Sequence, residues 1–276
     1  MIVVPILDQH ISKMKGYKFR SDWSDEKSSS LLTRCVIYFA SPGKFNDPYD
    51  CKINMRYDLE VPSELLDHMK RLAVSNEPQS ATKDIDEKVR VACDRFLNPD
   101  CQEEVMLVNE SLVNKAIGVF SLAGAVDNNL LWSHYSDSHK GFCIEYDLEV
   151  LQDHFAWLLD RKHIMIEGVE VAYVSEYPNI LVTKLSNEER FYEQVRYKCH
   201  DWCYEKEYRF VGMYIPNTEI PIPSEAITSV ILGYRSNDNQ ENGIKDSVSK
   251  MDHKPKLMKA KRNPHSFDLE FVQIEY

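Results

Sequence analysis

The hydrophobic pattern of the chain changes at residue 118, and this change limits the folds that the chain can adopt. Before this point, apolar side chains recur at helical spacing over residues 62–75, 82–96 and 100–117. After it come short β-prone runs bounded by glycine or polar turns, such as residues 118–124 and 141–148. We therefore expect three helices, followed by segments that build a sheet.

Further strands are expected on both sides of the three helices. An apolar run within residues 31–40 is stopped by the turn at 41–43. Later strands are expected in residues 167–175, 208–213, 226–235 and 267–276. Together these elements predict an α+β fold with a mixed or antiparallel sheet as its core. The most economical arrangement is a single domain over residues 1–276, with residues 62–117 as a helical insertion.

A further helix is expected to begin at Ser186, which forms a capping-box pattern with Glu189. Its apolar face is expected to continue through Val195 and Cys199 to Trp202. Cys199 and Cys203 lie close together in the sequence, but no second pair of ligands at zinc-binding spacing accompanies them. We therefore expect Cys199 to face a helical core, and we expect no metal site.

The charge of the chain narrows the classes of function. It has 44 Asp and Glu against 33 Lys and Arg, a formal net charge of −11, which argues against a protein that coats nucleic acid but leaves room for a local basic groove. No stretch is apolar for long enough to span a membrane, and the start of the chain lacks the pattern of a signal peptide. The seven scattered cysteines are typical of a reducing compartment, so a cytoplasmic protein without a membrane partner is expected.

Four segments concentrate aromatic, charged and small polar residues at the expected edges of strands. They are residues 17–20, 38–50, 130–147 and 201–209. Loops and strand ends are where binding and catalytic groups are usually held by a rigid scaffold. In the second segment, Asn46 and Asp47 follow a Pro-Gly turn. Their side chains either fold back onto backbone amides as an Asx-turn, or Asn46 or Asp47 forms a hydrogen bond with the ribose or amide of a bound nucleotide.

The third segment contains Ser133, His134 and Tyr135 in succession. His134 is a candidate general acid or base near neutral pH, and Ser133 or Tyr135 is a candidate hydrogen-bond donor to a ligand. A histidine beside aromatic residues is equally often a structural residue. No Gly-x-Ser-x-Gly pattern surrounds Ser133, which argues against a serine hydrolase.

In the fourth segment, Glu205 and Glu207 stand where a strand is expected to begin, so their side chains are expected on one face about 6–7 Å apart. Two carboxylates so close repel each other, and such a pair can divide into a hydrogen-bonding partner and an ionised group. The ionised carboxylate suits the stabilisation of an oxocarbenium-like sugar cation. The structural alternative is that Lys206 and Arg209 neutralise the pair on a solvated edge.

These four segments resemble the bacterial DUF2971 proteins. The resemblance rests on YKFR at 17–20, FNDP at 45–48, WSHYSDSHKG at 132–141 and WCYEKEYR at 202–209, and a VILG at 230–233 extends it towards the C-terminus. The order of the elements is in turn similar to that of ADP-ribosyltransferases. That similarity implies an ADP-ribosyltransferase-like fold, with NAD as the substrate.

The similarity to ADP-ribosyltransferases also implies roles for particular residues. Arg20 is expected to hold a phosphate of NAD, since a guanidinium binds phosphate oxygens in pairs. Ser133 or Tyr135 is expected to shape the nicotinamide pocket. Glu207 is the expected catalytic carboxylate, and Glu205 is expected to position the acceptor.

Three functions from different classes therefore remain open. The first is an ADP-ribosyltransferase-like enzyme that cleaves the nicotinamide bond of NAD and transfers ADP-ribose to an unknown protein or nucleic-acid acceptor, as a toxin or defence effector. The second is a metal-dependent nuclease with Asp47, Asp50, Glu145 and Glu207 as ligands of magnesium, although no Asp…Glu-x-Lys signature appears in order. The third is a module that binds a nucleotide or a partner without catalysis.

Overall fold

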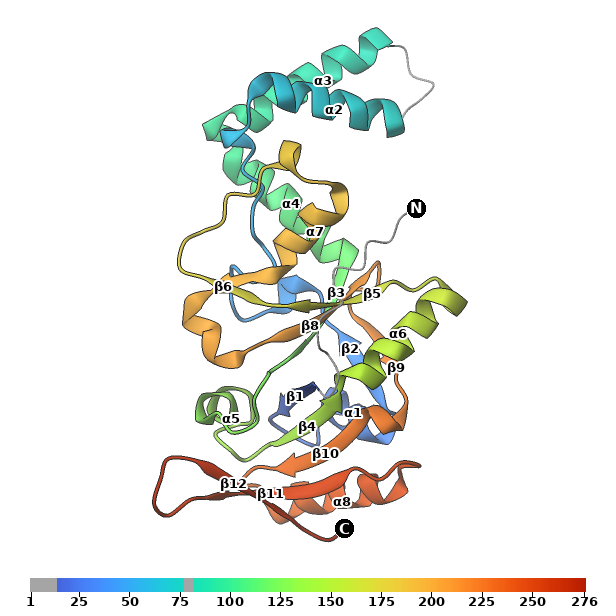
Figure 1. Cartoon of the computed structure of the whole chain (residues 1–276), viewed down its shortest axis with the longest axis vertical. Coiled ribbons are helices and arrows are strands. Elements are labelled where there is room, and N and C mark those ends of the chain that lie inside the picture. The colour runs from blue at the N-terminus through green and yellow to red at the C-terminus, as the bar shows by residue number, and fades with distance from the viewer. Residues whose placement is uncertain (1–13, 77–81) are drawn as a thin grey trace. The chain divides into compact units, whose positions relative to one another are not determined.

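The computed structural model describes residues 14–76 and 82–276, and its contacts divide the chain into two compact units (Figure 1). In the described residues, the first unit comprises residues 14–40, 118–170 and 203–276, and the second comprises residues 41–76, 82–117 and 171–202. The segment 62–117, predicted as an insertion, falls in the second unit. The single domain over residues 1–276 stays a prediction.

The first unit is built on a mixed five-stranded sheet. In spatial order its strands are β1 (Lys15–Arg20), β4 (Phe142–Asp147), β10 (Ile227–Leu232), β11 (Lys256–Arg262) and β12 (Leu269–Gln273). Strands β10 and β11 are parallel, and the other neighbours are antiparallel. The protein is therefore α+β, as the alternation of helical and β-prone segments predicts.

Each face of this sheet carries its own hydrophobic cluster, because successive side chains of a strand point to opposite faces. On one face, Ile144 and Val230 pack in the larger cluster with residues of three helices. These helices are α1 (Glu26–Thr33), α6 (Leu148–Lys162) and α8 (Asp238–Lys250). On the other face, Phe19 and Cys143 pack with Trp132 of the short helix α5 (Asn129–Tyr135).

Two smaller sheets complete the first unit. One has the order β3 (Ile117–Leu122), β8 (Tyr208–Met213) and β5 (Ile166–Glu170), and the other pairs β2 (Val36–Phe39) with β9 (Thr218–Pro221). The strand predicted over residues 167–175 is divided into β5 and β6 (Ala172–Val174), which belong to different sheets.

The second unit contains the predicted helices. They are α2 (Pro62–Asn76), α3 (Thr82–Leu97) and α4 (Gln102–Ala116), and α7 (Asn187–Arg196) follows later in the chain. A parallel pair joins β6 to β7 (Tyr197–Cys199). Leu65 of α2 and Val89 of α3 are buried in one cluster with Val182. The periodicity of residues 62–117 is thus confirmed as helical.

The prediction for the helix that begins at Ser186 is correct at its start and wrong at its end. The capping box of Ser186 and Glu189 is present. However, α7 ends at Arg196, because Tyr197 begins a strand that pairs with β6. Cys199 is consequently exposed and does not face a helical core.

Within residues 14–76 and 82–276, six short 3-10 helices connect the main elements. They cover Pro42–Lys44, Tyr57–Leu59, Pro99–Cys101, Val182–Lys184, His200–Glu205 and Ser224–Ala226, and the fifth of them is labelled η5 below. In the described parts of the chain, no helix is both long enough and apolar enough to cross a membrane.

Candidate functional site

The turn that follows α5 has an unusual backbone. Asp137, Ser138 and His139 adopt positive φ angles of 45°, 54° and 68° in succession. The left-handed region is unfavourable for residues other than glycine, and such strain persists only where the surroundings enforce it. Here the N–H of His139 donates to the carbonyl of Trp132 at 3.2 Å, and the N–H of Gly141 donates to that of Ser136 at 2.8 Å. Strained turns of this kind cluster at functional sites.

Gly141 allows this turn to approach the end of β1. A Cβ atom at position 141 would lie 1.9 Å from the carbonyl oxygen of Arg20, closer than any side chain permits. The turn is therefore fixed against the backbone of the sheet. It presents its side chains from a rigid support.

Trp132 anchors the same turn from within the core. Its side chain is fully buried, and its indole N–H donates to the carbonyl of Val126 at 2.6 Å. Its ring is nearly perpendicular to that of Phe19, with the ring centroids 5.1 Å apart. The imidazole of His139 lies parallel to the indole, with ring centroids 6.1 Å apart. Core packing thus fixes the orientation of His139.

Ser133 and His139 form a polar pair at this turn. The Oγ of Ser133 lies 3.4 Å from the Nε2 of His139. The Nδ1 of His139 is buried and has no hydrogen-bond partner among residues 14–76 and 82–276. Burial, and then the charge of Arg235, lower the pKa of His139, so its ring is neutral at neutral pH. It can therefore accept or donate a hydrogen bond to a ligand.

Sequence reasoning selected His134 and missed His139. His134 is exposed, and its ring centroid lies 6.4 Å from that of Tyr204. A signal for His139 was present in the sequence, because His139 stands two residues before a glycine that ends a polar turn. What the sequence did not show is that the turn folds back onto Trp132.

The structure brings Tyr135 and Glu205 together, and the sequence analysis placed both in one candidate site. The Tyr135 hydroxyl donates to Oε1 of Glu205 at 2.7 Å, and Glu205 is 5% exposed. The carbonyl of Glu205 accepts the N–H of Gly124 at 2.9 Å. Glu205 is therefore held by both its side chain and its backbone.

The sequence predicted that Glu205 and Glu207 lie together at the start of one strand, and the structure differs from this prediction. Glu205 closes the 3-10 helix η5, Lys206 has a φ of 46°, and β8 begins only at Tyr208. The positive φ between the two glutamates interrupts the alternation of a strand, so the rule that places residues i and i+2 on one face does not apply to them.

Glu207 forms a buried ion pair with Arg209. The Nε of Arg209 donates to Oε1 of Glu207 at 2.7 Å, and Nη2 donates to Oε2 at 3.0 Å. The side chain of Arg209 is fully buried, and Glu207 is 6% exposed. The sequence analysis offered neutralisation of the glutamates by Lys206 and Arg209 on a solvated edge as the structural alternative. Arg209 does neutralise Glu207, but in the interior of the protein.

Arg20 lies on the opposite face of the sheet from α5. It pairs with Phe142 of β4, whose side chain packs in the larger cluster, whereas the neighbouring Phe19 packs against Trp132. The Nε of Arg20 is buried without a hydrogen-bond partner in the described residues, and burial lowers the pKa of the guanidinium. Arg20 therefore does not join Ser133, Tyr135 and Glu205.

Asn46 and Asp47 belong to the second unit. Asn46 is exposed, whereas Asp47 is 5% exposed and its Oδ1 accepts the N–H of Tyr49 at 2.9 Å. This contact is an Asx-turn, the structural use that the sequence suggested as one alternative. The nucleotide contact proposed for these two residues stays a prediction.

The carboxylates named for a nuclease each have another contact. Asp50 pairs with Lys198 at 3.4 Å, Glu145 accepts from the Thr228 hydroxyl at 2.5 Å, and Glu207 pairs with Arg209. Within the part of the chain that the structure describes, no group of three or more His, Cys, Asp and Glu side chains is arranged to hold a metal ion.

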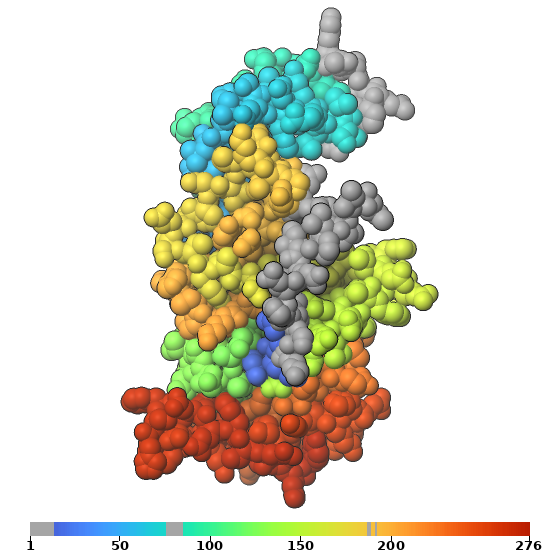
Figure 2. All heavy atoms as spheres, viewed as in Figure 1, coloured from blue at the N-terminus to red at the C-terminus, as the bar shows by residue number. Residues whose placement is uncertain are grey.

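A pocket of about 710 Å³ opens beside the strained turn, at the end of the five-stranded sheet. Its lining residues include Asn129, His139, Tyr234, Lys261, Arg262 and Phe267. The hairpin loop between β11 and β12, residues 263–268, forms one side of it and projects beyond the sheet (Figures 1 and 2). Asn129 fixes this loop by donating to the carbonyl of Phe267 at 2.6 Å.

The pocket is both basic and aromatic. Arg262 lies over the ring of Tyr234, 5.4 Å from its centroid, and Phe267 is 97% exposed. Lys261 and Arg262 have no ion pair with any described residue, whereas Lys259 is neutralised by Glu241. The surrounding sequence is basic in an acidic chain, because residues 245–265 hold seven Lys and Arg against two Asp. This is the local basic groove that the net charge of −11 left possible.

Fold and site together define an α+β protein with a basic, aromatic pocket beside a strained histidine turn. Residues 131–210 match the model of the family DUF2971, which is described as a protein of unknown function. The matched region includes the strained turn, Tyr135, Glu205 and the Glu207–Arg209 pair. Neither the search of curated proteins nor the search of solved structures found a match.

Proposed function

We propose that the basic pocket of the first unit binds an anionic nucleotide, with NAD as the ligand. The observation that carries the proposal is that Arg262 has no ion pair in the described residues and lies over the ring of Tyr234, with Lys261 and Phe267 also in the pocket wall. Cations of this kind bind phosphate oxygens, and aromatic faces stack on bases. A volume of about 710 Å³ lies within the range of cofactor sites.

His139 supplies a third kind of contact. Its Nδ1 is buried without a partner in the described parts of the chain, which costs free energy unless a ligand completes the hydrogen bond. A ribose hydroxyl both donates and accepts, so it satisfies either tautomer of the imidazole. Phosphate, base and sugar each have a matching group in the pocket.

Replacing Lys261 with Gln is expected to weaken NAD binding about tenfold, because one charge-assisted contact to phosphate is lost. Isothermal titration calorimetry measures the effect, and R262Q is expected to behave alike. The matched control is K254Q, since Lys254 is exposed, carries the same charge and does not line the pocket. Equal losses in K261Q and K254Q would place the ligand elsewhere, as would NAD binding that does not weaken with salt.

A second candidate is ADP-ribosyl transfer, in which the nicotinamide bond of the bound NAD is cleaved. The supporting observation is the hydrogen bond from Tyr135 that fixes the Glu205 carboxylate. A fixed carboxylate can stabilise the sugar cation that forms when nicotinamide leaves. Glu207 is less suited to this role, because both of its oxygens accept from Arg209.

If the transferase hypothesis holds, E205Q reduces the release of nicotinamide from NAD about 100-fold while NAD binding persists. Y135F is expected to reduce release less, because it removes the positioning donor and keeps the carboxylate. E149Q is the control, since Glu149 is an exposed residue of the first turn of α6. Absence of nicotinamide release by the unmodified protein, with water and with protein and nucleic-acid acceptors, rules the transferase out and leaves the binding proposal standing.

A further inference from the structure

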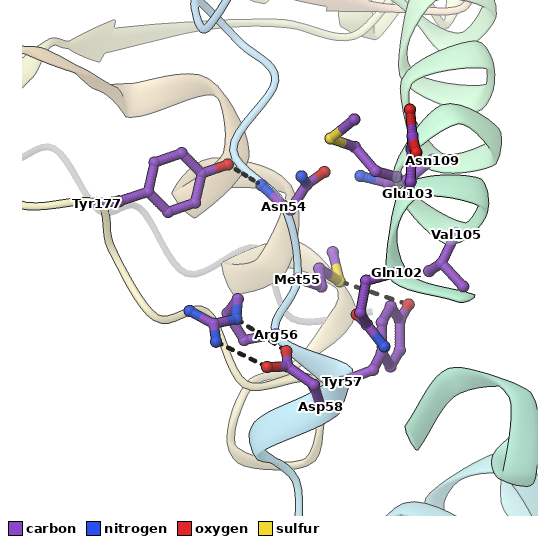
Figure 3. A pocket seen from close by; sticks show the side chains of 11 residues that line it. Asn54, Met55, Arg56, Tyr57, Asp58, Gln102, Glu103, Val105, Asn109 and Tyr177 are labelled. Atoms are coloured by element: carbon purple, nitrogen blue, oxygen red, sulfur yellow. Dashed lines mark hydrogen bonds and ion pairs between the residues drawn. The ribbon is translucent and has the colours of Figure 1, made fainter. Parts of the chain in front are cut away.

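The second unit contains a separate pocket of about 350 Å³ (Figure 3). One side is the segment 54–58, a second side is helix α4, and Tyr177 contributes from a third segment. Four of the α4 residues in its wall are Gln102, Val105, Met106 and Asn109, which share one helical face. The volume is that of a site for a small molecule or one side chain.

Asn54 brings an unsatisfied acceptor to this pocket. Its backbone N–H donates to the Tyr177 hydroxyl at 2.8 Å, and its side chain points towards α4 (Figure 3). The Oδ1 of Asn54 is buried and accepts no hydrogen bond from any residue in the described ranges 14–76 and 82–276. Buried acceptors without a donor are costly, so a ligand with an N–H or O–H group stabilises this arrangement.

The charges of the pocket select against anions. Arg56 uses its guanidinium on Asp58, with distances of 2.8 Å from Nε and 2.7 Å from Nη2, and its Nη1 donates to Asn179 at 3.0 Å. Glu103 of α4 is exposed and forms no ion pair with a described residue. The wall therefore offers carboxylate and amide oxygens, while its one arginine is already neutralised. A phosphate or carboxylate ligand is disfavoured here.

The remaining wall is apolar. The side chains of Met55, Val105 and Met106 line the pocket, and the ring of Tyr57 is stacked on Phe96 with centroids 4.6 Å apart. The Tyr57 hydroxyl donates to the sulfur of Met55 at 3.8 Å, so this polar group is occupied within the wall. Flexible thioethers beside aromatic rings accommodate an aliphatic chain or a cation.

We propose that this pocket binds a guanidinium group carried on an aliphatic stem. A guanidinium presents five N–H donors in one plane, which allows it to donate to Asn54 and to Glu103 at the same time. Its stem then lies against the methionines. The inference does not depend on the nucleotide proposed for the first unit, because the two pockets share no residue.

The test compares N-butylguanidine with N-butylurea, which has nearly the same shape and no charge. Titration calorimetry on the full chain is expected to show that N-butylguanidine binds and that N-butylurea binds at least about tenfold more weakly. Equal binding of the two compounds, or no binding of N-butylguanidine at millimolar concentration, overturns the proposal.

Two variants locate the binding. N54L is expected to weaken N-butylguanidine about tenfold, because it removes the buried acceptor. E103Q is expected to weaken the binding of N-butylguanidine about twofold to fivefold, because the charge of Glu103 is exposed. This second variant keeps the proposal testable if N54L does not fold. E104Q is the matched control, because Glu104 pairs with Arg95 and lies outside the pocket. Equal effects of E103Q and E104Q contradict the assignment.

An arginine of a partner protein and a small free guanidine share this chemistry. A blocked tripeptide with a central arginine distinguishes them in competition with N-butylguanidine. Displacement by the peptide supports a protein side chain as the ligand, and failure to displace supports a free small guanidine.

Discussion

Replacing Arg209 with Met is expected to lower the free energy of unfolding by about 3–5 kcal/mol, because it removes the cation that pairs with the buried Glu207 carboxylate. The pair is in the interior and both oxygens of Glu207 are bonded to Arg209. The loss of one partner therefore exposes the other to the full desolvation cost of a buried charge. Urea unfolding followed by circular dichroism at pH 7 measures the change.

The same variant makes a prediction about pH. Burial and the loss of a bound cation raise the pKa of a carboxyl group, so Glu207 of R209M takes up a proton more readily than in the unfolded chain. The loss of unfolding free energy in R209M is therefore expected to be complete at pH 7 and to become smaller as the pH falls towards 5. R34M is the control, because Arg34 and Glu219 form an exposed pair at 2.9 Å, and its loss costs less than about 1 kcal/mol. Equal deficits in R209M and R34M contradict the buried pair.

Replacing Trp132 with Ala is expected to destabilise the first unit by about 3–5 kcal/mol, since a fully buried indole leaves a cavity among Phe19, Leu131 and Cys143. NAD binding is expected to fall as well, because His139 loses the ring against which it lies. Circular dichroism during urea unfolding measures the first effect, and calorimetry at a temperature where the variant is folded measures the second.

Trp157 provides the matched control for this prediction. It is 48% exposed on α6, so W157A removes the same side chain without opening a core cavity. The expected change is about 0.5 kcal/mol, with NAD binding unaltered. A loss of binding in W157A, or its retention in W132A, contradicts the role of the indole in orienting His139.

These stability predictions also affect how the transferase hypothesis is tested. A variant of Glu207 changes a buried ion pair, so a loss of activity in E207Q does not distinguish catalysis from folding. Glu205 accepts from a neutral hydroxyl, and E205Q keeps a group that can accept the same bond. Glu205 is therefore the informative position.

The helices of residues 62–117 could be predicted from the sequence because an amphipathic pattern is a local property. The face formed by Leu65, Ile85 and Val89 is visible in the order of the residues, and it is buried in the second unit. The ends of elements were harder to predict. Tyr197 leaves the helix because it pairs with β6, and that partner is set by the tertiary fold.

The candidate site was predicted only in part, for a similar reason. The sequence indicated Tyr135 and Glu205 as site residues, and the structure joins them through a hydrogen bond. Nothing in the sequence indicates that Lys206 adopts a positive φ, which separates Glu205 from Glu207. The pocket formed by Arg262 and Phe267 depends on a hairpin that folds back beside His139, and no local pattern encodes that proximity.

The order of the strands has a consequence for the synthesis of the chain. β1 lies at the edge of the five-stranded sheet and pairs with β4 about 130 residues later, while β12 at the other edge ends at Gln273. The second unit, by contrast, has all its segments once residue 202 has been made. During translation we therefore expect the second unit to fold first, while β1 waits for partners that leave the ribosome later.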